Sequence, residues 1–139
     1  MKIFSVAEHS KLEGYKLYST KIEAGFPSPA DDYIEGQLDL NEFLVKNPPA
    51  TFFVRVSGES MIGAGIHPND LLIVDRSIKP KAGKVVIAVI NGEFTVKRLV
   101  DRNGSFWLVP ENSKFPEKQI KDDEDVLIWG VVTNVIHPL

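Results

Sequence analysis

The sequence predicts one compact, mostly antiparallel all-β domain with a single short helix, preceded by an N-terminal arm. Short apolar runs rich in β-branched and aromatic residues follow one another closely from residue 51 onward. Turn residues separate these runs, as is typical of antiparallel sheets. The 139 residues, 43% of them hydrophobic, suffice for one domain with a real core.

The first 30 residues differ from the rest of the chain. They mix Lys, Glu and Ser with scattered apolar side chains and show no sustained period. The sequence GFPSPA at residues 25–30 contains two prolines, which lack N–H donors and favour extended, accessible chain. We therefore interpret residues 1–30 as a mobile arm and residues 31–139 as the β domain.

One short helix is expected directly after residue 39. Asp39 followed by Glu42 is a capping-box pattern, with Asp39 as N-cap. Leu40, Phe43 and Leu44 then fall on one helical face. The prolines at positions 48 and 49 end the helix.

A hairpin is expected around Asn91 and Gly92, since Asn-Gly is the preferred dipeptide of a type I′ turn. The turn joins the buried-strand candidate at residues 85–90 to a strand at residues 94–99. Further strands are expected at residues 51–56, 71–74, 105–109 and 127–136.

Composition excludes several classes of function. The absence of cysteine excludes a disulfide framework, a thiol nucleophile and a cysteine-based zinc site. A net charge of -3 argues against a general nucleic-acid binder.

No secretory signal is visible, and no apolar run approaches the roughly 20 residues that span a bilayer. We expect a cytoplasmic protein without membrane contact. His9, His67 and His137 lack metal-ligand spacing, so neither a metal nor a cofactor is expected.

Ser60 lies in the sequence SGESM at residues 57–61, directly after an expected strand. A serine at this place is typical of a helix N-cap, whose hydroxyl accepts a backbone N–H. The same position also suits a nucleophile, because free N–H groups nearby can stabilise an oxyanion. Both interpretations of Ser60 are open from this pentapeptide alone.

Lys97 lies in the middle of the strand that follows the hairpin. An exposed strand lysine is the default expectation. A lysine can instead serve as the base for a serine nucleophile if burial disfavours its charged form. His67 is a weaker candidate for the base: it is seven residues from Ser60, in a segment typical of a turn.

At these residues the chain resembles the UmuD proteins, within the LexA-like family of self-cleaving serine peptidases. The resemblance covers nearly the whole chain and rests on five segments in matching order and spacing. These segments are AGFPSPA at residues 24–30, DLN at 39–41, SGESMI at 57–62, NDLLIVD at 69–75 and GEFTVK at 92–97. Asn69 stands where glycine is common in the family.

The resemblance implies a role for each matching residue. Ser60 matches the nucleophile and Lys97 its general base. The bond between Ala24 and Gly25 matches the bond that such proteins cut in themselves. Met61 follows the nucleophile, and we infer that its backbone N–H is an oxyanion donor.

The resemblance also implies a fold, a trigger and partners. The fold is that of the LexA/UmuD C-terminal peptidase domain. The trigger is RecA on single-stranded DNA during the SOS response. The processed residues 25–139 then join a UmuC-type polymerase subunit in translesion synthesis. UmuD-like proteins are homodimers. LexA repressors also carry an N-terminal helix-turn-helix domain, for which the 24 residues before the cut are too few, so we do not expect this chain to read operator DNA itself.

Two alternatives remain open at this stage. The chain could be a non-catalytic interaction module of a polymerase, with a vestigial pair of Ser60 and Lys97. Less favoured is a processing enzyme like the signal peptidases, which share serine–lysine chemistry but carry a membrane anchor. Cleavage of the chain at high pH argues against the first, and cleavage of an exported precursor would support the second.

Overall fold

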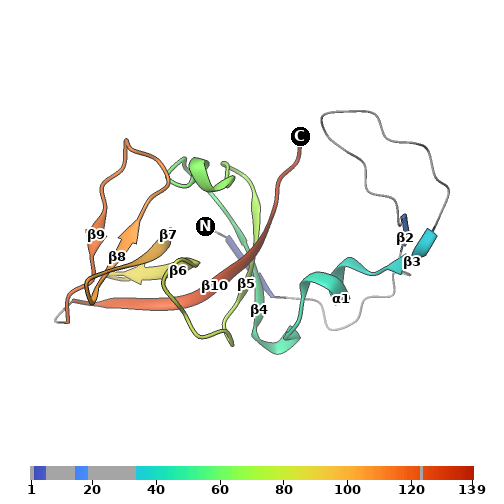
Figure 1. Ribbon diagram of the computed structural model, residues 1–139, viewed down its shortest axis with the longest axis horizontal. Coiled ribbons are helices and arrows are strands. Elements are labelled where there is room, and N and C mark those ends of the chain that lie inside the picture. The colour runs from blue at the N-terminus through green and yellow to red at the C-terminus, as the bar shows by residue number, and fades with distance from the viewer. Residues whose placement is uncertain (1, 6–14, 19–33, 123) are drawn as a thin grey trace. The chain divides into compact units, whose positions relative to one another are not determined.

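The computed structural model describes residues 2–5, 15–18, 34–122 and 124–139 (Figure 1). The chain divides into two compact units, one made of Met1–Val6 with Asn47–Leu139 and the other of Ala7–Lys46. The scissile-bond candidates, Ala24 and Gly25, lie outside the described residues.

The larger unit is built on one eight-stranded sheet, in the order β1-β4-β5-β10-β6-β7-β8-β9 (Figure 1). Each strand in this order runs antiparallel to its neighbours. This architecture confirms the predicted mostly antiparallel β fold. The strands are β1 (Lys2–Ser5), β4 (Thr51–Arg55), β5 (Leu71–Asp75), β6 (Val85–Ile90), β7 (Glu93–Arg102), β8 (Ser105–Val109), β9 (Lys118–Gln119) and β10 (Val126–Ile136).

The smaller unit contains β2 (Tyr15–Tyr18), β3 (Ile34–Leu38) and α1 (Leu40–Leu44). β2 and β3 form a two-stranded antiparallel sheet. The Asp39 side chain accepts a hydrogen bond from the Asn41 backbone N–H at 3.0 Å, which confirms Asp39 as the N-cap of α1.

The segment interpreted as an arm thus contains two described strands. β1 pairs along β4, and β2 pairs with β3. No strand was expected there, because the polar residues of this segment hide the alternation on which strand prediction depends. The arm as a separate domain, residues 1–30, stays a prediction.

The hairpin between β6 and β7 places Lys97. Ile90 pairs with Glu93 across a two-residue turn, and both turn residues have positive φ, 49° at Asn91 and 80° at Gly92. These angles are those of the expected type I′ turn. The turn fixes the register, so that Lys97 lies opposite Val86 on the neighbouring strand.

Strand β10 joins the two halves of the sheet. Its first half pairs with β6 and its second half with β5, with a register shift in each ladder. Gly130 lies where β10 changes partner, and a Cβ there would meet Val74 Cγ1 at 2.6 Å. Close packing of β10 on β5 therefore requires glycine at this position.

Two apolar clusters form the core of the sheet. Successive residues of β6 point to opposite faces of the sheet and so pack into different clusters. Ile87 belongs to the first cluster, and Val86 and Ala88 belong to the second. The first cluster also takes in the loop that follows β4. Its buried members are Val54, Val56, Met61, Ile66, Leu72, Val74, Ile87 and Val96. Those of the second are Val86, Ala88, Leu99, Leu108 and Val131.

Candidate active site

Ser60 lies in a turn between β4 and the short 3-10 helix Ile62–Ala64. The N-cap of that helix is Met61, without a side-chain cap bond, so Ser60 is not its N-cap. Met61 is 2% exposed and belongs to the first core cluster, as does Val56 at the other end of the loop. The core thus anchors the Ser60 loop on both sides.

A second loop fixes the backbone of Ser60 from the side. The Glu111 backbone N–H donates to the Ser60 carbonyl at 2.9 Å, and the Gly63 N–H donates to the Glu111 carbonyl at 2.8 Å. The Asn112 side chain donates to the Glu59 carbonyl at 2.9 Å. These three bonds connect the segment after β8 to the turn that carries Ser60.

Lys97 reaches Ser60 from β7. Its Nζ lies 3.1 Å from Ser60 Oγ, 2.8 Å from Thr95 Oγ1 and 3.0 Å from the Val96 carbonyl oxygen. The Lys97 side chain is partly buried, whereas a lysine in a strand is expected by default to be exposed. Burial lowers the pKa of Lys97, because it disfavours the charged form.

Two depressions flank the pair. The smaller, of about 120 Å³, lies beside Ser60, and the larger, of about 560 Å³, lies beside Lys97. Phe94 and Thr95 line both. Gly58 lines the smaller one, and a Cβ built on it would meet nothing within 4 Å. Open space therefore lies beside both members of the pair.

His67 does not reach Ser60 as the alternative base. Its Nδ1 instead lies 3.7 Å from Asp70 Oδ2, and its ring stacks on that of His137 at a centroid distance of 4.5 Å. The spacing of the histidines along the chain gave no sign that His67 and His137 lie close together. The chain brings residues 67 and 137 together by pairing β5 with β10, which their spacing does not reveal.

Asn69 shows how the departure from the family pattern is accommodated. Its φ is 72°, in the left-handed region where glycine is at no disadvantage. Asparagine is among the few other residues that adopt this region readily. The turn before β5 therefore keeps its shape without glycine.

A fold and a site of this kind define a LexA-like serine peptidase domain. The Peptidase S24-like family matches residues 16–133, and the chain belongs to this family, whose members are self-cleaving serine peptidases. Within it, the chain is a UmuD-like member, and relatives of 46–51% identity support the SOS mutagenesis branch.

Three relatives illustrate the similarity. Protein ImpA of Salmonella typhimurium is 51% identical over 87% of this chain and 82% of its own length. Protein MucA of Escherichia coli is 46% identical over 99% of this chain and 95% of its own. Protein SamA of Salmonella typhimurium is 47% identical over 87% of this chain and 84% of its own. None of the helices in the described residues is long and apolar enough to span a bilayer.

Proposed function

We propose that Ser60 and Lys97 form a catalytic dyad with which the chain cuts its own Ala24–Gly25 bond. The observation that carries this proposal is the 3.1 Å contact between Lys97 Nζ and Ser60 Oγ, at an amine whose pKa is lowered by burial. A serine hydroxyl is a weak nucleophile unless an adjacent base takes its proton. Lys97 in its neutral form is such a base.

The reaction proceeds in two stages. Lys97 Nζ takes the Ser60 proton while Ser60 Oγ attacks the Ala24 carbonyl carbon, and the Met61 N–H stabilises the oxyanion that forms. The carbon–nitrogen bond to Gly25 then breaks, and the Lys97 ammonium returns the proton to the leaving amine. A water molecule, deprotonated by Lys97, then attacks the ester carbon of Ala24. The bond to Ser60 Oγ breaks, and the Lys97 ammonium returns the proton to Ser60.

An intramolecular substrate suits this site. A scissile bond in the same chain is present at high effective concentration, so slow chemistry suffices. The rate of self-cleavage is then controlled by whether the Ala24–Gly25 bond is placed next to Ser60. We propose that a RecA filament on single-stranded DNA promotes this presentation, and that the protein acts as a cytoplasmic homodimer without a cofactor.

The processed chain, residues 25–139, is proposed to act as the accessory subunit of a UmuC-type translesion polymerase. Removal of residues 1–24 takes away four Lys and three Glu, so the product changes from 16 basic and 19 acidic residues to 12 and 16. Its net charge becomes -4, against -3 for the intact chain. A more acidic product favours a protein partner over direct contact with DNA.

The test is self-cleavage of purified protein at about pH 10, near the ordinary lysine pKa, followed by intact mass. Wild type is expected to lose residues 1–24, and Ser60→Ala and Lys97→Ala to remain whole. Lys118→Ala is the matched control, because Lys118 lines the same depression as Lys97 but pairs with Glu124. This variant should cleave as wild type does.

RecA filaments separate an inactive site from a missing activator. Wild type that stays whole at pH 10 but is cut when filaments are added has the dyad and requires its trigger. Wild type that stays whole in both conditions contradicts the proposed dyad and favours the non-catalytic polymerase module.

A further inference from the structure

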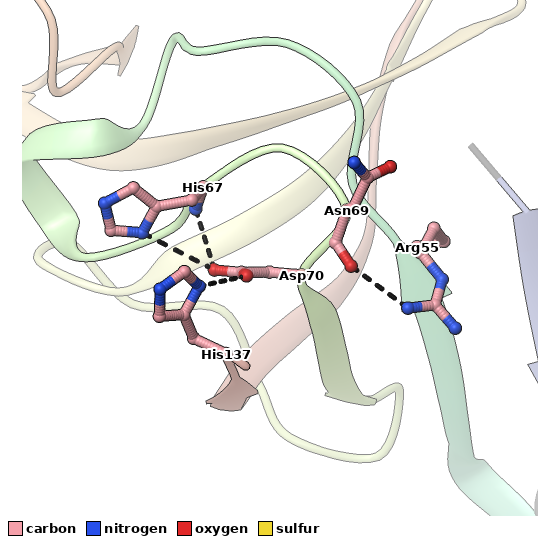
Figure 2. Close-up of polar contacts among 5 residues, drawn as sticks. All are labelled: Arg55, His67, Asn69, Asp70 and His137. Atoms are coloured by element: carbon pink, nitrogen blue, oxygen red, sulfur yellow. Dashed lines mark hydrogen bonds and ion pairs between the residues drawn. The ribbon is translucent and has the colours of Figure 1, made fainter. Parts of the chain in front are cut away.

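A buried carboxylate lies at the centre of a second cluster of polar side chains. Asp70 is 0% exposed and directly precedes β5. Its Oδ2 accepts the His67 backbone N–H at 2.8 Å, and its Oδ1 lies 2.6 Å from His137 Nδ1 (Figure 2). The two oxygens of one buried carboxylate are thus directed at two histidines.

The two imidazoles converge on this carboxylate from different parts of the chain. His67 belongs to the turn before β5, and His137 follows the last residue of β10. Their rings stack at 4.5 Å with planes tilted by 32°, and both Nδ1 atoms face Asp70 (Figure 2). The ligand atoms of the three residues all lie within 4.8 Å of one another.

The nitrogen of His67 lacks a partner. Its Nδ1 is shielded from solvent and makes no hydrogen bond, alone among buried side-chain nitrogens and oxygens in the part of the chain that the structure describes. The 3.7 Å to Asp70 Oδ2 is too long for a hydrogen bond. A buried polar atom without a partner is costly and calls for a physical reason. A cation between this nitrogen and the carboxylate supplies one.

We infer that His67, Asp70 and His137 bind one Zn²⁺ ion. Two imidazole nitrogens and one carboxylate oxygen are ligands that zinc takes readily, with a fourth position left for water. Imidazole favours zinc over magnesium and calcium, which prefer oxygen ligands. This inference goes beyond the proposed function and does not depend on self-cleavage.

Zinc binding requires the three side chains to adjust. Zinc at about 2.0–2.2 Å from each ligand in a tetrahedral site places neighbouring ligand atoms about 3.4 Å apart. His67 Nδ1 now lies 3.7 Å from Asp70 Oδ2, and His137 Nδ1 lies 2.6 Å from the other oxygen, Oδ1, so the side chains must shift until both imidazoles face the same oxygen. The His137 side chain is 40% exposed, so solvent and not packed core lies on one side of it.

The bound ion would hold the end of β10 against the turn before β5. That turn is already tied to the end of β4: the Asn69 N–H donates to the Val56 carbonyl at 2.8 Å, and the Arg55 guanidinium donates to the Asn69 carbonyl at 3.0 Å (Figure 2). Val56 begins the loop that carries Ser60. The site therefore stabilises the fold near one end of this loop.

The test is calorimetric titration of the full chain with ZnCl₂ after removal of metals by EDTA. Wild type is expected to bind one equivalent and to melt at a higher temperature with zinc. His67→Ala and His137→Ala should each weaken binding at least about tenfold, as loss of a metal-site residue does. His9→Ala, which removes the third histidine of the sequence, is the matched control and should bind as wild type does.

Additional variants and a second metal ion serve as controls for this titration. Ser60→Ala should bind zinc normally, which separates this inference from the proposed dyad. Circular dichroism checks that the alanine variants fold. If either fails to fold, Co²⁺ added to wild type should give the visible absorption of a tetrahedral site. Four results overturn the inference: no saturable zinc binding by wild type, undiminished binding by both folded histidine variants, an equal melting shift with Mg²⁺ or Ca²⁺, or no tetrahedral Co²⁺ spectrum.

Discussion

The amine of Lys97 has as many partners as a neutral amine can satisfy. A neutral amine carries two N–H donors and one lone pair, whereas the charged form carries three donors and no acceptor. Three oxygens lie within hydrogen-bond distance of Nζ: Ser60 Oγ, Thr95 Oγ1 and the Val96 carbonyl. The charged amine donates to all three, whereas the neutral amine can donate to Thr95 and Val96 and accept from the Ser60 hydroxyl. Burial lowers the pKa of Lys97 and so favours the second arrangement.

The pH dependence of self-cleavage should report the pKa of Lys97. Burial lowers this pKa, so the rate should rise with pH and level off below about 10.4, the ordinary lysine value. Intact mass over a series of buffers measures the rate. Lys97→Arg should be inactive at every pH, because a guanidinium keeps its proton. A flat profile, or cleavage by the arginine variant, would contradict the role of Lys97.

The same pKa shift predicts how stability responds to pH. Between the lowered folded pKa and the ordinary value, the unfolded chain holds a proton on this lysine that the folded chain does not. The contribution of Lys97 to stability is thus least favourable below the folded pKa and improves as pH rises through this window. Lys97→Met should be more stable than wild type at pH 7, by an amount that shrinks towards pH 10. Urea unfolding at both pH values checks this, and a constant difference would speak against it.

Thr95 should orient the Lys97 amine. Thr95→Val removes the acceptor 2.8 Å from Nζ while keeping the side-chain shape. A hydrogen bond contributes about 0.5–1.5 kcal/mol, so cleavage should slow by roughly twofold to tenfold. Thr95→Ser keeps the oxygen and should retain most of the rate. The pH profile of Thr95→Val distinguishes an effect on the amine from a general loss of structure, because only the former moves its midpoint.

At the scale of elements, the position of Ser60 depends on two loops that meet. The turn after β4 carries Ser60, and the segment after β8 bonds to its backbone through Glu111. The Glu111 carboxylate also pairs with Arg98, next to Lys97 on β7, at 2.6 Å. Glu111 thus connects the backbone of Ser60 to the strand that carries Lys97.

Gly63 is the position at which this connection is most sensitive. A Cβ there would meet the Glu111 carbonyl oxygen at 2.7 Å, so Gly63→Ala must push the two loops apart. Such overpacking costs about 1–3 kcal/mol, and cleavage should slow because Ser60 moves with Glu111. Ile62→Ala is the control in the same turn: its side chain is 38% exposed, and its loss should cost less. Thermal unfolding and intact mass measure both effects, and unchanged cleavage by folded Gly63→Ala would rule out this coupling.

Local patterns predicted most elements of the larger unit. β6 and β8 begin and end where expected, and β4, β5 and β10 differ from expectation by one residue at one end. β7 begins one residue earlier and ends three residues later than expected. β9 was missed because its two residues are too short to show alternation. The Ser60–Lys97 contact could be inferred only from a family resemblance, since periodicity does not specify which distant side chains meet. The cluster of His67 and His137 was missed for the same reason.

At the scale of the whole molecule, the core of the described residues lies downstream of the proposed cut. In this part of the chain, both apolar clusters draw their buried members from residues 54–131. A chain of residues 25–139 should therefore unfold cooperatively, with a melting temperature lowered by no more than about 5 °C, the equivalent of roughly 1 kcal/mol. Calorimetry on this truncated chain and on full-length Ser60→Ala makes the comparison. Loss of the cooperative transition would show that the upstream segment is part of the fold.

The pairing of β1 with β4 would give the proposed cut a second effect. Residues 2–5 occupy the outer side of β4, where Lys2 lies opposite Arg55 and Ser5 opposite Phe52. After scission at residue 24, no covalent bond would join this four-residue strand to β4, and its pairing with β4 would remain. If β1 dissociated, β4 would become an edge strand. Its unpaired backbone donors and acceptors would then be available for the addition of another strand. Proteolysis would then do more than shorten the chain: it would expose a strand edge on which an extended segment of another polypeptide can pair.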